Sequence, residues 1–360
     1  ADKKSISLYT CIVYLLLEKQ ETKESLIHEV DVPDDVMNKL SLVSLIEPAS
    51  ENISETMAVK YSFPEWMINE WIKSYGNENI KDLCSSLNTQ GPMTIRVNTI
   101  KTTVEECQKI LQQDGIETER TQLSPFGLHL KKRVNLFQLQ AFKDGFFEVQ
   151  DEGSQLLSLL VDPKPRGKVI DACAGAGGKA LAMATVMKNR GEIFAMDIHS
   201  FRLGELRKRI KRSGVDIIRV KTIRENDVVN ELVGTVDTVL VDAPCSGTGT
   251  IRRNPGMKWT VTEKMIDEMH GKQLSILSLN AQYVKPNGRL IYATCSLMKH
   301  ENEEVVESFL SQHPNFELLS PASILERYQL ASLGNNKYFQ LLPHQFNTDG
   351  FFAAVMKRMS

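Results

Sequence analysis

The most informative segment of the chain reads Val169-Ile170-Asp171-Ala172-Cys173-Ala174-Gly175-Ala176-Gly177-Gly178-Lys179. Its apolar start predicts a buried strand over residues 169–172, and the residues that follow predict a helix over 179–188. Three glycines between a strand and a helix allow backbone N–H groups to approach a ligand closely. The segment, called the glycine turn below (residues 171–179), therefore predicts the first strand and helix of an α/β domain, although a purely structural turn is the alternative.

The same alternation continues to the C-terminus. Further strands are expected over residues 192–196, 217–221, 236–241, 289–293, 316–319 and 351–356, and further helices over 199–212, 262–284 and 301–312. This spacing is typical of a doubly wound, Rossmann-like and mostly parallel sheet.

Two other parts precede this domain. Residues 1–60 have amphipathic spacing that predicts helices over 5–19, 23–29 and 34–45. A linker helix is expected over 61–75, and strands over 93–98, 116–121 and 128–130 with a helix over 103–114 predict a small α+β unit. The expected domains are therefore residues 1–60, 61–150 and 151–360.

Composition excludes several classes of protein. The chain has 360 residues, of which 42% are hydrophobic and 24% charged, as is usual for a soluble globular protein. No apolar run reaches the roughly 18 residues of a membrane span, and no signal peptide is evident. Six cysteines without a C-x-x-C pair argue against a zinc site and a disulfide framework. We expect a cytoplasmic, metal-free protein, monomeric because no extended apolar heptad is evident.

Charge is unevenly distributed. Residues 1–90 carry 15 acidic and 8 basic residues, whereas residues 91–360 carry 30 and 35. Basic clusters occur at Lys131-Lys132-Arg133, at 202–212 and at Arg252-Arg253. Such clusters suit a phosphate backbone, and for 202–212 a solvated helix face is an equal alternative.

The sequence of the glycine turn limits which ligands it can bind. An ATP-binding P-loop is excluded because Cys173 stands where its first glycine is needed and Ala180 where its hydroxyl is needed. Gly175-x-Gly177-x-x-Ala180 fits a relaxed dinucleotide fingerprint, and Asp197 ends the next predicted strand, where an acid can accept hydrogen bonds from a ribose. Both NAD and S-adenosylmethionine remain open at this point.

Two cysteines indicate the chemistry. Cys245 follows the fourth predicted strand of the doubly wound domain and Cys295 the fifth, so both are expected at the crevice beside the turn. Hydride transfer needs neither thiol, whereas methylation of carbon 5 of a pyrimidine needs at least one: a thiolate adds to carbon 6 and makes carbon 5 nucleophilic. Asp242 is placed to hydrogen-bond ring N3.

Further motifs extend this pattern in a fixed order: Tyr61-Ser62-x-Pro64-x-Trp66, Arg96-Val97-Asn98-Thr99, Val149-Gln150-Asp151-Glu152-Gly153-Ser154, Gly177-Gly178-Lys179, Asp242-Ala243-Pro244-Cys245-Ser246-Gly247-Thr248-Gly249, Ile251-Arg252-Arg253-Asn254-Pro255, Lys258-Trp259, Tyr292-Ala293-Thr294-Cys295-Ser296, Glu301-Asn302-Glu303 and Thr348-Asp349-Gly350-Phe351-Phe352. From about residue 61 to the C-terminus, the chain resembles the RNA cytosine-5 methyltransferases of the Nop/Sun family, in particular their bacterial ribosomal RNA branch.

The resemblance implies a methyltransferase fold, preceded by a ferredoxin- or RRM-like unit and an N-terminal helical domain. It implies that Cys295 is the nucleophile, that Cys245 assists product release, and that Lys179 approaches the target base. It also implies an S-adenosylmethionine site formed by Cys173, Ala174, Gly175, Ala176, Gly177, Gly178, Lys179, Asp197, Arg202, Asp227 and Asp242. Ribosomal RNA is the implied substrate and transfer RNA the alternative, held by the small α+β unit and the basic clusters, with Arg252-Arg253 near the mouth of the site.

The chain departs from the family pattern at the turn. The family usually has Ala-Pro before Gly-Gly-Lys-Thr, whereas this chain has Gly175-Ala176 before the glycines and Ala180 after the lysine. A second hypothesis is therefore an RNA-binding ribosome-assembly factor that has lost catalysis. A third, an NAD-dependent oxidoreductase, rests on the glycine pattern alone.

Overall fold

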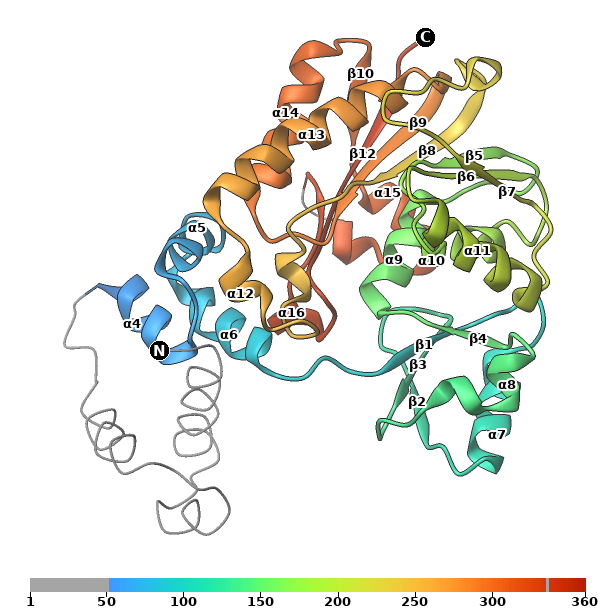
Figure 1. Cartoon of the computed structure of the whole chain (residues 1–360), viewed down its shortest axis with the longest axis horizontal. Coiled ribbons are helices and arrows are strands. Elements are labelled where there is room, and N and C mark those ends of the chain that lie inside the picture. The colour runs from blue at the N-terminus through green and yellow to red at the C-terminus, as the bar shows by residue number, and fades with distance from the viewer. Residues whose placement is uncertain (1–51, 335–336) are drawn as a thin grey trace. The chain divides into compact units, whose positions relative to one another are not determined.

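The computed structural model describes residues 52–334 and 337–360 (Figure 1). The chain divides into two compact units, residues 1–60 and 61–360. The helices expected over 5–19, 23–29 and 34–45 lie outside the described residues, and helix α4 (Ile53–Tyr61) is the described end of the first unit. Within the described part of the chain, no helix is long and apolar enough to cross a membrane.

The second unit begins with two helices, α5 (Glu65–Tyr75) and α6 (Asn77–Asn88). They are separated by Gly76, whose φ of 83° is left-handed, so the expected helix end after Tyr75 is confirmed. Trp71 on α5 is fully buried and packs edge-to-face against Phe63. Helix α6 was not expected.

The small α+β unit contains a four-stranded antiparallel sheet in the order β2-β3-β1-β4. Its strands are β1 (Thr94–Val97), β2 (Thr118–Arg120), β3 (Gly127–Leu130) and β4 (Phe147–Val149), of which only β4 was not expected. Helix α7 (Val104–Gln113) begins where the Thr103 side chain accepts a hydrogen bond from the Glu106 amide. A short helix α8 (Gln140–Lys143) precedes β4.

The main sheet has the order β10-β12-β9-β8-β5-β6-β7, with β11 paired to β12. Five strands are parallel: β5 (Lys168–Asp171), β6 (Glu192–Asp197), β7 (Ile218–Thr222), β8 (Val236–Asp242) and β9 (Val284–Thr294). The antiparallel edge consists of β10 (Phe316–Leu319), β11 (Phe339–Leu341) and β12 (Phe351–Arg358). The sheet is therefore mostly parallel and doubly wound, as predicted.

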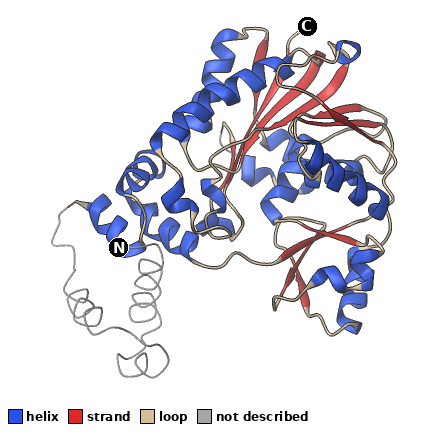
Figure 2. Cartoon of the chain, in the orientation of Figure 1, coloured by secondary structure: helices blue, strands red, loops and turns tan. Residues whose placement is uncertain are grey.

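Helices cover both faces of this sheet (Figure 2). One core contains side chains of α9 (Glu152–Val161), α10 (Gly178–Val186) and α11 (Ser200–Ser213). The other contains side chains of α13 (Glu263–Ala281) and α14 (Glu303–Gln312). The short helices α12 (Met257–Thr260), α15 (Ala322–Leu325) and α16 (Pro343–Phe346) lie in connections.

Two predicted boundaries are wrong. The linker helix expected over residues 61–75 begins only at Glu65. The helix expected over residues 262–284 ends at Ala281, and β9 begins at Val284 rather than at Arg289. Val284 pairs with Val236 of β8, and the register then shifts between Val236 and Thr238. The shift falls at Pro286-Asn287-Gly288, which we had expected to end the helix and which instead interrupts the pairing of β9 with β8.

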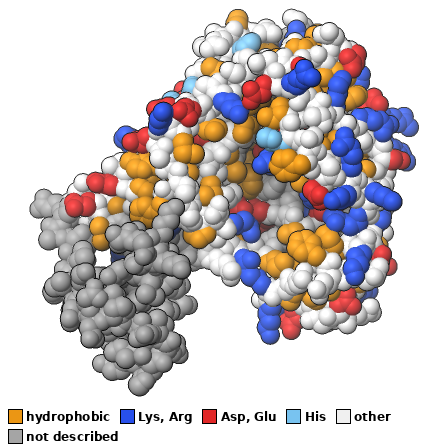
Figure 3. All heavy atoms as spheres, in the orientation of Figure 1, with side chains coloured by type: hydrophobic (Ala, Val, Ile, Leu, Met, Phe, Trp, Pro, Cys, Tyr) orange, Lys and Arg blue, Asp and Glu red, His pale blue; other side chains and the backbone are white. Residues whose placement is uncertain are grey.

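The small unit is attached to α11 by buried polar contacts. Glu148 of β4 binds Arg209 at 3.0 Å and Arg212 at 2.5 Å, and the Asn98 amide donates to the Ser213 carbonyl oxygen. Arg209 and Arg212 of the basic cluster 202–212 therefore have a structural role. Lys and Arg side chains nevertheless gather on the surface over α11 (Figure 3), where Arg207 is among the exposed ones.

Candidate functional site

The glycine turn joins the end of β5 to the start of α10. Gly177 has a φ of 80°, and a Cβ atom there would overlap the side chain of Leu206, so the position requires glycine. The Gly175 amide donates to Oδ2 of Asp197 over 2.8 Å. The turn thus presents the N-terminus of a nine-residue helix, with its unpaired amides, beside the carboxyl end of β6.

Asp197 anchors the turn. Besides Gly175, it accepts a hydrogen bond from the His199 amide on Oδ1 at 2.8 Å, and its side chain is buried. The acid predicted at the end of the second strand therefore lies against the turn.

Asp171 is a carboxyl group that the sequence-based prediction did not select. It ends β5, is buried, and neither of its oxygens has a hydrogen-bond partner among the described residues. Burial raises its pKa to about 7, and the carboxylates of Asp242 and Asp197 add to this rise. Its position at the end of a predicted strand could have identified Asp171 as a site residue from the sequence.

Lys179 and Asp242 form an ion pair, with 2.5 Å between Nζ and Oδ2. Both are partly exposed, with 14% and 25% of their side-chain surfaces accessible. Burial lowers the pKa of Lys179, but the attraction and hydrogen bond of Asp242 outweigh it, so the net pKa is raised. A charged ammonium therefore stands beside Asp242 at the crevice, a contact that the sequence-based prediction did not include.

The two cysteines meet beyond the ends of β8 and β9, with their sulfur atoms 3.5 Å apart. The strands are parallel neighbours in which Asp242 pairs with Ala293, so the loops that follow them leave the sheet side by side. The hydrogen bond with Cys295 and burial raise the pKa of Cys245 well above the ordinary thiol value. Both thiols remain partly accessible.

A buried acid behind the cysteines was missed. Glu301 accepts hydrogen bonds from Ser246 and Ser296, the residues that follow the two cysteines. The sequence signal was its inclusion in Glu301-Asn302-Glu303, which was noted only as part of the resemblance.

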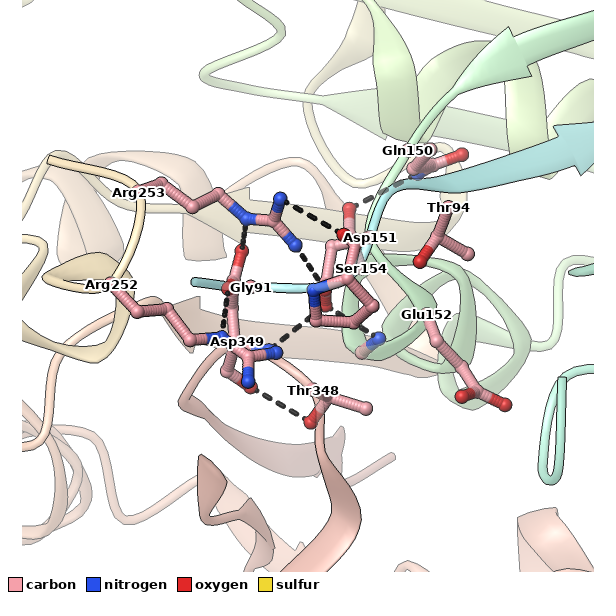
Figure 4. Close-up of polar contacts among 12 residues, drawn as sticks. Gly91, Thr94, Gln150, Asp151, Glu152, Ser154, Arg252, Arg253, Thr348 and Asp349 are labelled. Carbon is pink, nitrogen blue, oxygen red and sulfur yellow. Dashed lines mark hydrogen bonds and ion pairs between the residues drawn. The ribbon is translucent and has the colours of Figure 1, made fainter. Parts of the chain in front are cut away.

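The expected RNA contact at Arg252-Arg253 is wrong for Arg252. Its side chain is fully buried and binds Asp349 (Figure 4). Arg253 binds both Asp349 and Asp151 and is 34% exposed. Two carboxylates thus hold these guanidinium groups within the protein, and a buried arginine cannot reach a phosphate.

Two predicted cofactor residues lie away from these contacts. Arg202 is exposed on α11, with its guanidinium 5.8 Å from the Phe201 ring. Asp227 is exposed in the loop after β7 and accepts a hydrogen bond from the Arg224 amide. In the described structure, neither forms a hydrogen bond or ion pair with the glycine turn.

The remaining turn residues lie where the prediction put them. Residues Cys173, Ala174, Gly175 and Ala176 connect β5 to the helix. The Ala176 carbonyl oxygen accepts a hydrogen bond from Arg209 over 2.7 Å, so the ion pair of Glu148 with Arg209 also steadies the turn. Burial is the main cause of a raised pKa at Cys173, which suits a structural thiol. No group of three or more His, Cys, Asp or Glu side chains suited to a metal occurs within residues 52–334 and 337–360.

Comparison with known proteins gives consistent matches. A family model described as 16S rRNA methyltransferase RsmB/F matches residues 158–357, and a model of the RsmF/B-like ferredoxin-like domain matches residues 63–136. The chain is 35% identical over 314 residues to a probable ribosomal RNA small subunit methyltransferase B of Bacillus subtilis, covering 86% of this chain and 69% of that protein.

Two further relatives agree. The 25S rRNA (cytosine-C(5))-methyltransferase nop2 of Schizosaccharomyces pombe is 32% identical over 288 residues, covering 75% of this chain and 46% of that protein. The solved structure of a methyltransferase homologue from Pyrococcus horikoshii matches with a TM-score of 0.72 and 27% identity, covering 86% of this chain and 100% of that one. The fold predicted from the resemblance, a ferredoxin-like unit before a Rossmann-like sheet, is confirmed. The chain belongs to the RsmB/F family of 16S rRNA methyltransferases.

Proposed function

We propose that the protein transfers a methyl group from S-adenosylmethionine to carbon 5 of cytosine in RNA, with small-subunit ribosomal RNA as the substrate. The proposal is carried by one observation: two thiols 3.5 Å apart lie at the crevice that also holds the Lys179–Asp242 ion pair. The names of the relatives, a small-subunit methyltransferase and a cytosine-C(5) methyltransferase, support the same reaction and substrate.

The charge of the crevice favours S-adenosylmethionine over NAD. Asp171, Asp197 and Asp242 end three neighbouring strands, and Lys179 is paired with Asp242. Three carboxylates suit a ligand with a positive sulfonium and ammonium, and they repel a pyrophosphate. The proposed cofactor contacts are Cys173, Ala174, Gly175, Ala176, Gly177, Gly178, Lys179, Asp197 and Asp242, with Arg202 and Asp227 at the periphery.

Cys295, Asp242 and Cys245 would each carry a different step of the reaction. The Cys295 thiolate adds to carbon 6, and Asp242, positioned by Lys179, acts in its protonated form or shares a proton with N3, so that the negative charge developing on the ring is stabilised. The cofactor supplies an electrophilic methyl group for carbon 5. A water molecule then takes the carbon 5 proton, and the electron pair of that bond restores the ring double bond as the bond from carbon 6 to sulfur breaks with its electron pair on sulfur. Cys245 is placed to donate its proton to the departing Cys295 sulfur.

The test is covalent trapping. A Cys245→Ala variant incubated with substrate RNA and cofactor should accumulate an RNA–protein adduct that survives denaturing electrophoresis, and Cys295→Ala should form none. Cys107→Ala, at a buried cysteine of α7 outside the site, should trap nothing and is the control. Adduct formation by Cys295→Ala and not by Cys245→Ala would reverse the two roles.

The altered turn motivates a second candidate, an RNA-binding assembly factor without catalysis. Gly175 and Ala176 replace the family's usual Ala-Pro, and Ala180 replaces its threonine. Calorimetry with S-adenosylmethionine separates the candidates, because absence of binding would favour the assembly factor. Bisulfite sequencing of total RNA from cells lacking the protein would tell ribosomal from transfer RNA.

A further inference from the structure

Glu301 is the most fully bonded acidic side chain near the cysteines. It lies in a single 3-10 turn, Lys299–Glu301, between β9 and α14, and none of its surface is exposed. Its carboxylate accepts four hydrogen bonds: from the Ser246 amide at 2.7 Å, from the Ser246 and Ser296 hydroxyls at 2.5 Å each, and from Gln273 Nε2 at 3.0 Å. A carboxyl group that accepts four bonds and donates none is ionised.

These donors belong to both cysteine loops. Ser246 directly follows Cys245, and Ser296 directly follows Cys295. Gln273 of α13 also donates to the carbonyl oxygen of Pro244 over 2.9 Å, so Ser246 binds the carboxylate directly and Pro244 is linked to it through Gln273. One carboxylate thus joins two loops that are far apart in the sequence.

No cation neutralises this carboxylate. Its four donors are uncharged, and no ion pair to Glu301 occurs in the described part of the chain. The ionisable groups that face Cys245 are Cys295, Glu301 and Tyr292, whose hydroxyl donates to the Glu301 carbonyl oxygen. All three are neutral or negative and disfavour a thiolate at Cys245, and they outweigh the backbone N–H of Cys295, which favours it.

We propose that Glu301 is a positioning residue for the methyl transfer: its carboxylate fixes the two cysteine loops against each other, and its charge keeps Cys245 in the thiol form. This inference rests on the proposed function. In that form Cys245 can give its proton to the Cys295 sulfur as the latter takes the electron pair of its bond to carbon 6. A water molecule takes the carbon 5 proton, and the electron pair of that bond between carbon 5 and hydrogen forms the new double bond.

Two substitutions of Glu301 separate the effect of its negative charge from the effect of its side-chain length. Glu301→Gln removes the charge and replaces one acceptor oxygen by a donor, whereas Glu301→Asp keeps the charge but is too short to reach both loops. Glu307→Gln is the matched control, because Glu307 lies on α14 with 57% of its side chain exposed and forms an ion pair with Lys337, 4.0 Å away, rather than with either cysteine loop.

The first measurement needs neither RNA nor cofactor. In a Cys295→Ser background, alkylation of Cys245 by iodoacetamide is followed across pH by peptide mass spectrometry. Glu301→Gln should lower the midpoint by about one pH unit, since a nearby negative charge is removed. Glu301→Asp and Glu307→Gln should leave the midpoint in place. An unchanged midpoint in Glu301→Gln would overturn the role of the charge.

The second measurement follows the RNA adduct in single turnovers, with both cysteines present. Glu301→Gln and Glu301→Asp should each prolong the adduct's lifetime roughly tenfold, as expected for loss of a hydrogen bond to a charged group, while Glu307→Gln matches the wild type. Wild-type lifetimes in both Glu301 variants would overturn the positioning role. If neither the wild type nor Cys245→Ala forms an adduct, the covalent function fails instead, and the alkylation profile still decides the protonation state of Cys245. If Glu301→Gln does not fold, Glu301→Asp decides the positioning role alone.

Discussion

Lys179 Nζ lies 2.5 Å from Asp242 Oδ2, although the two residues belong to different elements, the first turn of α10 and the end of β8. The contact crosses the point at which the strand order of the sheet reverses, since β5 lies between β6 and β8. In doubly wound sheets this is where ligands bind. The ion pair therefore joins the glycine turn to the strand that leads to Cys245.

Lys179→Ala should reduce the single-turnover rate of methyl transfer by roughly two orders of magnitude or more, the range of one lost acid–base group. Asp242 would lose its cation and face Asp171 across the crevice. Rates are measured at saturating cofactor and RNA. Lys188→Ala, an exposed position shortly after α10, should retain the wild-type rate; equal losses in both variants would contradict the assignment.

Asp171 predicts a pH dependence of stability. Its pKa of about 7 in the folded protein exceeds the roughly 3.9 of an unfolded chain, so its contribution is fully present below about pH 4 and is lost as pH rises through 7. Asp171→Asn should therefore match the wild type near pH 4 and have the higher free energy of unfolding at pH 8. Urea titrations without cofactor, at several pH values, measure this. The exposed Asp216→Asn should show no such trend, and a constant difference in Asp171→Asn would refute the prediction.

Replacement of glycine by alanine should have opposite effects on stability at Gly177 and at Gly204. Gly177→Ala places a Cβ atom on the Leu206 side chain at a φ of 80°, so it should weaken cofactor binding and lower thermal stability. Gly204→Ala meets no atom within 4 Å in the middle of α11 and should raise the free energy of unfolding by about 0.5–1 kcal/mol. Thermal melts and calorimetry compare the pair; a stable Gly177→Ala variant that binds cofactor normally would contradict the turn geometry.

Glu148→Ala should destabilise the protein by about 3 kcal/mol, because it leaves the guanidinium groups of Arg209 and Arg212 without their buried anion. Cofactor affinity should fall too, since Arg209 also holds the Ala176 carbonyl oxygen. Chemical unfolding and calorimetry measure both effects. Glu119→Ala, exposed on β2 of the same small unit, is the control and should change neither.

Much of the fold follows from local pattern. Alternating strands and helices predicted the sheet, and parallel neighbouring strands that end in cysteines predicted that the two thiols meet. Helix α6 was missed because polar residues separate the buried Ile80, Leu83 and Leu87, whose spacing is nevertheless helical. Strand β4 has only three residues, too few for a periodic signal.

The errors at the site have a different origin. Arg252 and an RNA-binding arginine look alike in sequence, because only the fold supplies Asp349 as a buried partner. The same holds for Asp171 and Glu301, whose burial and neighbours come from distant elements. Sequence pattern predicts which side chains carry chemistry, and tertiary contacts decide which of them reach the ligand.

Three contacts decide which fragments of the chain can keep the fold. They are made by Glu148, Asn98 and Arg96. All three residues precede position 151, and each bonds a group that follows it: Arg209, the Ser213 carbonyl oxygen and Thr185. A fragment starting at residue 151 would begin at the predicted domain boundary. It would nevertheless leave the guanidinium groups of Arg209 and Arg212 on α11 without the carboxylate of Glu148. The domain boundary predicted between residues 150 and 151 is therefore not a place where the protein can be divided. The smallest fragment that keeps these contacts must include the small α+β unit.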